Sequence, residues 1–242
     1  MHRGVASRTL KGLRRAAAYW RAPSELDRMA ATHTGRVMNK WQHYFEIYDR
    51  HLARFRDRDI TLLEIGVAGG GSLELWRRYF GHRARIVGLD INPVCKNYAA
   101  DGIHVVIGSQ GDPQFLEQVA TKLGPFDIVI DDGSHSFEHQ LTTFGTPFPH
   151  IRNDGIYACE DLCSSYWADE FGGGVRKPGT FIEFLKGLID ELNAWFWRDD
   201  VGKEDGAFPL TVHGMHFYPA LVVIEKRMMQ KPLLTPVGKT RD

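Results

Sequence analysis

The sequence lacks an excess of charge, a disulfide framework and a long apolar run, and each absence narrows the class of protein. Its 30 basic and 30 acidic residues cancel, so no overall field favours nucleic acid or an anionic membrane as a partner. The three cysteines form no CxxC pair, which favours a reducing cytoplasm. No apolar run approaches the roughly eighteen residues that a membrane span needs. We therefore expect a cytoplasmic protein with a small-molecule partner, no nucleic-acid partner and no membrane span.

Short apolar segments alternate with helical patterns along the middle of the chain. Helical patterns follow the first, third and fourth apolar segments, and the last of these helices is expected to break near Pro147. The apolar segments are β-branched and bounded by Gly, Asp or Pro, as buried parallel strands are. They cover residues 59–66, 84–91, 102–109, 126–132 and 155–162. This rhythm predicts an open, doubly wound α/β sheet.

The segments on either side of this core extend the predicted fold. Residues 24–31 and 41–55 read as helices that cap one end of the sheet, and residues 180–197 read as one long amphipathic helix. Residues 210–219 and 220–227 have the pattern of two adjacent terminal strands. We therefore expect a reversed pair of strands to close the sheet.

These patterns divide the chain into three parts. We expect an N-terminal helical cap over residues 1–58, the α/β domain over residues 59–230 and a tail over residues 231–242. The basic start, residues 1–22, lacks the uninterrupted apolar core of a signal peptide. We interpret this start as a surface helix.

The first strand ends in a glycine-rich turn, "EIGVAGGGS". Ligands bind at the carboxyl ends of parallel strands, and glycines at such a turn let the backbone approach a ligand beside a helix N-terminus. A tight connection without a ligand is the alternative. The acid before the first glycine favours a ligand with positive charge and no phosphate, as in S-adenosylmethionine. The donor-binding candidates from this turn are Glu64, Gly66, Gly70 and Ser72.

The second and third strand ends support a nucleoside ligand. Asp90 ends the second strand and is placed to accept hydrogen bonds from both ribose hydroxyls, a feature that nicotinamide and S-adenosylmethionine enzymes share. Gln110 follows the third strand and is a candidate for reading the adenine edge, although a helix N-cap cluster around Asp112 explains the same residues equally well. The reversed final strands, around Tyr218, favour the methyl donor over a nicotinamide dinucleotide.

Two acidic pairs follow the fourth and fifth strands. Asp131 and Asp132 end "VIDD", and Glu160 and Asp161 lie in "CEDL". Neighbouring parallel strands finish at one edge of the sheet, so the carboxylates should converge and repel one another. No Lys or Arg lies within the two motifs, and a divalent cation is the economical explanation, with Mg²⁺ favoured over Mn²⁺ or Ca²⁺ and zinc disfavoured. Helix capping by Asp132 and Asp161 is the alternative.

Several motifs, taken in order, carry a family resemblance. They are "LLEIGVAGGGSLELW", "VGLDINP", "IDDGSH", "CEDLCSSYW" and "HFYPALVVIEK". Over roughly residues 25–227 the chain resembles the metal-dependent class I methyltransferases that O-methylate sugars in actinobacterial macrolides, rhamnosyl glycolipids and methylated mannose polysaccharides. Two departures stand out: Ala68 replaces the central glycine of the usual turn, and "THTGRVMNK" stands where the family commonly has Gly-Thr-Asp-Lys-Gly.

The resemblance implies a Rossmann-like class I methyltransferase fold with an antiparallel final strand, and a methyltransferase domain at residues 59–230. It implies Mg²⁺ ligands at Asp132, Glu160 and Asp161, and His135 as the base. We also count Asp131 with the donor-binding residues. The function expected is Mg²⁺-assisted transfer of a methyl group from S-adenosylmethionine to a hydroxyl of a mannoside, rhamnoside or other deoxysugar.

The chemistry is consistent with these roles and leaves alternatives open. A histidine with an unperturbed pKa of about 6.5 suits general-base work near neutral pH, while His135 as a helix cap, or as a partner of Asp131, is the alternative. There are three alternative functions. The chain could methylate another small hydroxylated acceptor, take part in hydroxylation-linked chemistry, or serve as a non-catalytic nucleotide-binding module. A homo-oligomer is a further open expectation. The loop of residues 164–179 has the length and glycines of a lid, and the aromatic candidates for stacking on a sugar, or for packing, are Tyr44, Tyr48, Tyr166 and Trp167.

Overall fold

The computed structural model describes residues 23–198 and 207–238, and a sheet of seven strands forms the centre of this part of the chain. The predicted surface helix at residues 1–22 lies outside the described residues. The strands are β1 (Thr61–Ile65), β2 (Arg85–Asp90), β3 (Ile103–Ile107), β4 (Phe126–Asp131), β5 (Ile151–Cys159), β6 (Val212–Tyr218) and β7 (Leu221–Lys226).

The strand order is β3-β2-β1-β4-β5-β7-β6. Strands β1 to β5 run parallel, while β7 runs antiparallel to both β5 and β6. The order reverses between β1 and β4, which is where an open α/β sheet binds its ligand. The predicted doubly wound sheet with an antiparallel final strand is confirmed.

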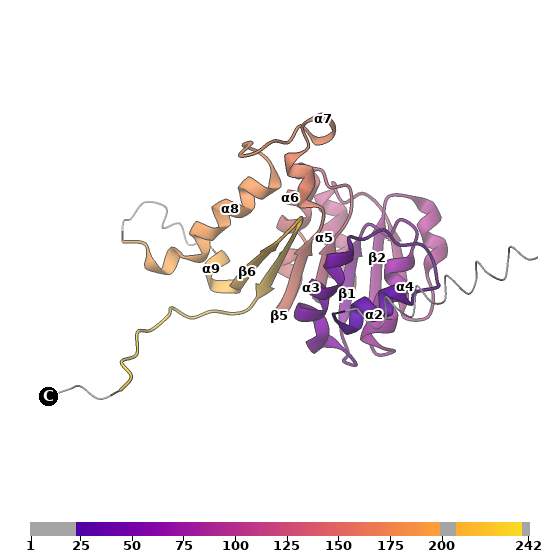
Figure 1. Cartoon of the computed structure of the whole chain (residues 1–242), viewed down its shortest axis with the longest axis horizontal. Helices are drawn as coiled ribbons and strands as arrows, with labels where there is room; N and C mark the ends of the chain where they lie inside the picture. Colours follow the sequence, from indigo (N-terminus) through magenta and orange to yellow (C-terminus); the bar gives the residue numbers. More distant parts are fainter. Residues whose placement is uncertain (1–22, 199–206, 239–242) are drawn as a thin grey trace, which may run out of the picture.

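Helices cover both faces of the sheet. One hydrophobic cluster joins the sheet to α2 (Glu25–Ala31), α3 (Gln42–Leu52) and α4 (Gly71–Phe80), and these three helices lie side by side in Figure 1. A second cluster joins the opposite face to α5 (Pro113–Leu123), α6 (Phe137–Gly145) and α8 (Phe181–Leu192). The short helices are α7 (Ala168–Phe171), α9 (Ala207–Thr211), η1 (Ala53–Phe55), η2 (Pro93–Tyr98), η3 (Phe148–His150), η4 (Leu162–Tyr166) and η5 (Ala194–Phe196).

The alternation of side chains along each strand decides which residues face which layer of helices. On β1, Leu62 packs in the cluster of α3 and α4, while Leu63 packs in the cluster of α5 and α8. On β4, Ile130 belongs to the first face and Val129 to the second. The same alternation separates Asp131, on the α5 and α6 side, from the acids that face α3.

Three details differ from the sequence expectations. The N-terminal helices lie against a face of the sheet and not at one end, because buried residues of α3 such as Tyr48 pack in the same cluster as Leu62. Strand β5 begins at Ile151, since its pairing with β4 continues past an irregularity near Phe126. The long helix ends at Leu192, because the side-chain amide of Asn193 donates to a carbonyl of its last turn. The break expected near Pro147 lies between α6 and η3, as predicted.

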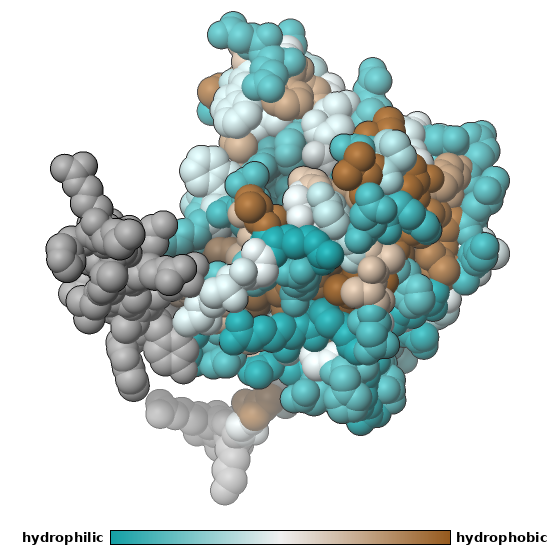
Figure 2. All heavy atoms as spheres, turned by 90° about the vertical axis from the view of Figure 1, so that its right-hand side faces the viewer, coloured by the Kyte–Doolittle hydropathy of each residue, from teal (hydrophilic) through white to brown (hydrophobic). Residues whose placement is uncertain are grey.

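The surface of the described residues is mixed in character. On the face drawn in Figure 2, apolar residues gather in patches separated by hydrophilic ones. Within residues 23–198 and 207–238, every helix is too short or too polar to cross a membrane. In the predicted tail, Leu233, Leu234 and Val237 are exposed.

Candidate functional site

A pocket lies at the carboxyl ends of β1, β2, β3 and β4. Its volume is about 590 Å³, with its open mouth included. Residues predicted from the sequence line it, and apolar side chains such as Leu89 contribute as well. Its place beside the reversal of strand order makes it the candidate donor pocket. The predicted residues that line it are Gly66, Asp90, Gln110 and Asp132.

Asp90 stands at the end of β2 with both carboxylate oxygens on backbone donors. Its Oδ2 accepts from the N–H groups of Val67 (2.9 Å) and Ala68 (3.0 Å), and its Oδ1 accepts from that of Asn92 (2.8 Å). Burial alone would raise the pKa of Asp90, but these backbone donors hold it below its usual range. The carboxylate is therefore ionised and fixed in orientation, and its remaining lone pairs are available to ribose hydroxyls.

The turn after β1 passes close to the end of β4. Gly66 has a φ of 96°, and a Cβ atom there would overlap the carbonyl oxygen of Asp132. Ala68, which replaces the glycine of the usual motif, also has a positive φ, 45°. Gly70 is the N-cap of α4, and the first N–H of that helix donates to the carbonyl of Val37 (3.1 Å). The N-terminal segment thus covers one side of the glycine-rich turn.

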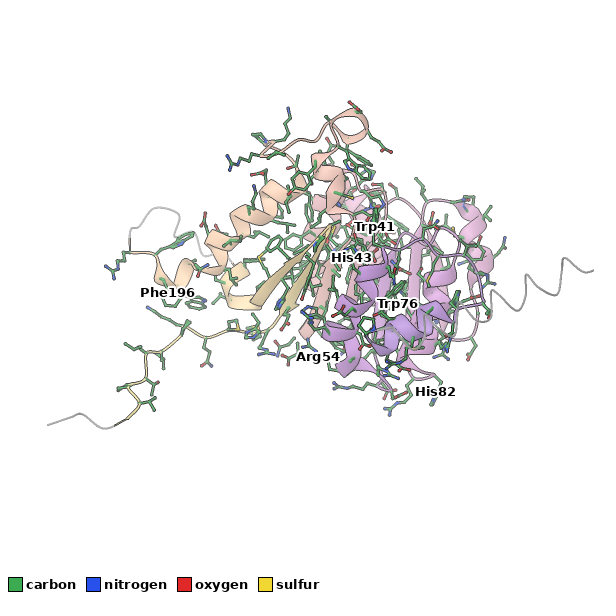
Figure 3. All side chains as sticks on the ribbon, in the orientation of Figure 1. Trp41, His43, Arg54, Trp76, His82 and Phe196 are labelled. Carbon is green, nitrogen blue, oxygen red and sulfur yellow. The ribbon has the colours of Figure 1, made fainter. Side chains whose placement is uncertain are left out.

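Glu64 and Ser72, two predicted donor-binding residues, do not line the pocket: Glu64 lies beneath α4, and Ser72 belongs to the first turn of that helix. Glu64 is fully buried, and it accepts from the Ser72 hydroxyl (2.7 Å) and from the indole N–H of Trp76 (3.0 Å). Figure 3 labels Trp76 among the helices beside the sheet. The reason is alternation along β1, which points Glu64 to the face of Leu62 and into the helix layer.

Gln110 and Asp131 form a buried polar link at the wall of the pocket. Gln110 Nε2 donates to Asp131 Oδ1 and to Thr143 Oγ1 at 3.2 Å each, and its Oε1 accepts from the N–H of Ser134 (2.6 Å). Among the described residues, Asp131 Oδ2 is buried without a hydrogen-bond partner. Burial raises the pKa of Asp131 to about 7. The hydrogen bonds of Gln110 therefore join the segment after β3 to the end of β4.

Lys40 lies at the centre of the acids from β1, β4 and β5. Its Nζ donates to Asp132 Oδ2 (2.8 Å) and Glu160 Oε1 (2.6 Å) and lies 3.3 Å from Glu64 Oε1. The Lys40 side chain is only 1% exposed. The basic partner that the two acidic motifs lack thus comes from the segment before α3. Lys40 is the last residue of "THTGRVMNK", the segment that departs from the family's common motif.

Three carboxylates around one ammonium leave an excess of negative charge in a buried cluster. Burial raises the pKa of Glu160 to about 8 even though Lys40 lowers it. Burial also raises the pKa of Asp132, against the attraction of Lys40. For Lys40 itself, burial would lower the pKa, but the surrounding acids hold it well above its usual value. The cluster therefore retains a proton near neutral pH, and a divalent cation has the charge to replace that proton.

Asp132, His135 and Asp161 form a second group on the open side of these acids. One ligand atom from each lies within 4.8 Å of the others, and His135 Nε2 is 3.5 Å from Asp161 Oδ2. His135 (φ 58°) and Asp161 (φ 52°) both adopt the left-handed backbone region, a strained conformation that is common at functional sites. Asp161 Oδ1 accepts from the Trp41 indole (2.9 Å) and the Tyr44 hydroxyl (3.0 Å), which leaves Oδ2 facing His135.

This group fits a hard divalent cation. Asp132 and Asp161 offer the carboxylate oxygens that Mg²⁺ prefers, and His135 lies beside them. Glu160, the other predicted ligand, is 1% exposed, and its Oε1 accepts from Lys40 and from the Tyr48 hydroxyl (2.6 Å). The structure thus brings Asp132 and Asp161, two of the predicted ligands, together with His135, the predicted base. The third predicted ligand, Glu160, is bound to Lys40 instead.

The aromatic candidates separate into two kinds. Tyr44 and Tyr48 are fully buried and use their hydroxyls to hold Asp161 and Glu160. Tyr166 and Trp167 are 48% and 46% exposed. Trp41, which was not among the predicted candidates, is 54% exposed. Figure 3 shows Trp41 near the start of α3, beside His43. The exposed ring of Trp41 is therefore available beside the acidic group, to which it donates a hydrogen bond, whereas the two tyrosines of α3 have a structural role.

Comparison with known proteins gives relatives among sugar O-methyltransferases. The chain is 41% identical over 214 residues to the 8-demethyl-8-(2-methoxy-α-L-rhamnosyl)-tetracenomycin-C 3′-O-methyltransferase of Streptomyces olivaceus, covering 84% of this chain and 54% of that protein. It is 42% identical over 202 residues to the demethylmacrocin O-methyltransferase of Streptomyces fradiae, covering 77% and 50%. No family model matches the sequence.

A solved structure of a methyltransferase is also similar to this chain. The MycE methyltransferase from the mycinamycin biosynthetic pathway, in complex with Mg, SAH and mycinamycin VI, is 33% identical with a TM-score of 0.74, over 86% of this chain and 55% of that chain. The present chain spans about half the length of the curated relatives that it matches.

The sheet order and the pocket at its strand ends define the fold of the class I S-adenosylmethionine-dependent methyltransferases, as the sequence predicted. Within that class, the chain is a homologue of sugar O-methyltransferases of antibiotic pathways over most of its own length. The resemblance read from the motifs is thereby confirmed.

Proposed function

We propose that the chain transfers a methyl group from S-adenosylmethionine to a sugar hydroxyl with the assistance of Mg²⁺, and that it does so in the cytoplasm. One observation carries the proposal: Asp132 belongs both to the pocket at the strand ends and to the group with His135 and Asp161. A donor site and a cation site would therefore share one wall, as methyl transfer to a chelated hydroxyl requires.

The binding roles follow from the contacts. Asp90, ionised and held by backbone N–H groups, would accept the ribose hydroxyls of the donor, while Gly66 lets the backbone pass close by. Asp132 and Asp161 would hold Mg²⁺ with free carboxylate oxygens. When bound, Mg²⁺ would orient neighbouring hydroxyls of the acceptor and lower their pKa, and the donor would supply a methyl group already activated by its sulfonium.

His135 would take the proton of the acceptor hydroxyl on Nε2. The hydroxyl oxygen then forms the new C–O bond as the bond from methyl to sulfur breaks, so the proton on His135 accounts for the charge that the sulfonium loses. His135 Nε2 lies 3.5 Å from Asp161 Oδ2, so the base would act directly beside the proposed cation site. Lys40 has no proton-transfer role in this scheme, because the acids hold its pKa well above its usual value; it fixes Asp132 and Glu160 in place.

The acceptor would lie beside the exposed aromatics. Trp41 donates to Asp161 and is 54% exposed, so one face of its ring is available to a sugar next to the proposed cation site. Stacking of sugar rings on such faces uses the apolar side of the pyranose. The acceptor would be a mannoside, a rhamnoside or another deoxysugar, and the assay below identifies the sugar and the hydroxyl that is methylated. Assembly into a homo-oligomer is a separate expectation.

The test is methyl transfer from isotopically labelled S-adenosylmethionine to a panel of rhamnosides, mannosides and deoxysugar-bearing macrolides, followed by mass spectrometry. We expect one methyl group on a sugar, abolished in Asp132→Asn and retained in His150→Ala. His150 is a suitable control because it pairs with Glu117 outside the donor pocket. Label on a non-sugar acceptor, or no label with any acceptor while the protein binds the donor, would reject the proposed reaction.

A further inference from the structure

A second group of metal-ligating side chains lies away from the donor pocket. It joins His51 at the end of α3, His216 in β6 and Glu225 in β7. Their ligand atoms lie within 4.8 Å of one another, and the two imidazole rings have centroids 4.6 Å apart. The three elements are remote in sequence, and the methyl-transfer scheme uses none of these residues.

The distances from the two histidine nitrogens to the Glu225 carboxylate match those between ligand atoms around one tetrahedrally coordinated ion. His216 Nε2 lies 3.1 Å and His51 Nδ1 lies 3.6 Å from Glu225 Oε1. Ligand atoms at the usual zinc distances of about 2.0–2.1 Å are about 3.3 Å apart in a tetrahedron. Two imidazoles and one carboxylate, with a fourth position for water, form a common set of zinc ligands. The geometry therefore needs little adjustment to hold the ion.

The second ring nitrogen of His51, Nε2, is held by a hydrogen bond. It lies 2.9 Å from the Tyr218 hydroxyl, so Nε2 can carry the proton and donate it while Nδ1 faces Glu225. This arrangement, in which one ring nitrogen binds the ion and the other is held by a hydrogen bond, is usual for metal-binding histidines.

An ion can reach the group from solvent. The side chain of His216 is 41% exposed, whereas those of His51 and Glu225 are 6% and 16% exposed. The group thus has one open side and two largely buried ligands. The two nitrogen ligands favour zinc or a similar borderline ion over Mg²⁺.

We propose that His51, His216 and Glu225 bind a zinc ion that joins α3 to the antiparallel end of the sheet. The role is structural. Helix α3 also carries Tyr44 and Tyr48, which hold the acids of the proposed catalytic site, so the ion would fix the helix that supports them. The proposal does not depend on the acceptor or on the methyl-transfer reaction.

The experiment is a thermal melt of the metal-free protein, titrated with ZnCl₂ and with MgCl₂ separately. At zinc about 100-fold above its Kd, the melting temperature should rise by roughly 5–10 °C, and calorimetry should give one zinc ion per chain at this site. Mg²⁺ should not reproduce the zinc shift. His216→Ala and Glu225→Gln should each remove most of it, and both are suitable tests because neither side chain is part of the apolar core.

Two control variants test whether the zinc ion binds at His51, His216 and Glu225. His213→Ala changes an exposed histidine of β6 three residues from His216 and should keep the full shift. Asp132→Asn alters the other group of ligands and should keep it too. The proposal is overturned if zinc gives no shift with the wild-type protein, if the shift survives in His216→Ala, or if it is lost in Asp132→Asn instead.

Discussion

The replacement of Lys40 by methionine would remove the only cation within 4 Å of three carboxylates in the described structure. Lys40 Nζ lies 2.6 Å from Glu160, 2.8 Å from Asp132 and 3.3 Å from Glu64. The side chains of these acids are 1%, 17% and 0% exposed, so little solvent reaches them to take the place of the ammonium. Methionine keeps the length and the apolar stem of lysine, which limits the change to the charge and its hydrogen bonds.

The expected loss of stability is large. Removal of one partner from a buried ion pair costs about 3–5 kcal/mol, because the remaining charge is left without compensation. For a chain of this size that corresponds to a fall in melting temperature of roughly 6–20 °C. The loss should be greater at pH 8 than at pH 5. Burial already raises the pKa of Glu160 and Asp132, so protonation relieves the repulsion at the lower pH.

Urea unfolding at pH 5 and pH 8 measures both effects. The control is Lys186→Met, since Lys186 forms an exposed i,i+3 pair with Glu183 and should change stability by less than about 1 kcal/mol. The reasoning is refuted if Lys40→Met costs no more than the control at pH 8. It is also refuted if the cost is larger at pH 5 than at pH 8.

Three further predictions concern single residues of the site. Burial raises the pKa of Asp131 to about 7 from 3.8, so the native state binds the extra proton and stability falls as pH rises from about 4 to 7, by up to about 4 kcal/mol. Asp131→Asn should flatten that part of the pH profile in thermal melts, and an unchanged slope would contradict the assignment. Asp90→Ala should weaken binding of S-adenosylhomocysteine by about 1.5–3 kcal/mol, measured by calorimetry, whereas wild-type affinity would reject the ribose contact. His135→Ala should lower kcat by about 10²–10⁴ with donor affinity intact, and normal turnover would mean that another group takes the proton.

The elements and the sheet edge could be predicted because they follow from local patterns. Short apolar, β-branched segments predicted five strands near their observed positions, and the ends of β1, β2, β3 and β4 do line one pocket. Three of the four acids after β4 and β5 do come together: Asp132 lies with Glu160 around Lys40 and with Asp161 in the group of His135. Alternation places Asp131 apart from them, against Gln110.

The contacts of the site could not be predicted because they depend on distant segments and on backbone angles. Lys40 is 92 residues from Asp132 and 120 from Glu160 in sequence, so no local pattern joins them. Alternation places Glu64 with Lys40 inside the helix layer, although the glycines after it had suggested a contact with the donor. His135 and Asp161 adopt left-handed angles that residues with side chains rarely show, and these angles bring the two together.

Metal dependence of methyl transfer tests the central claim most directly. The rate of label transfer to the acceptor sugar would be measured with untreated protein, with protein freed of metal by EDTA, and after Mg²⁺ is restored, while calorimetry follows donor binding in each state. The account predicts that transfer stops without metal and returns with Mg²⁺, that donor binding persists throughout, and that Asp132→Asn and Asp161→Asn remain inactive with Mg²⁺. Full transfer by the metal-free protein, or normal turnover by both variants, would contradict it.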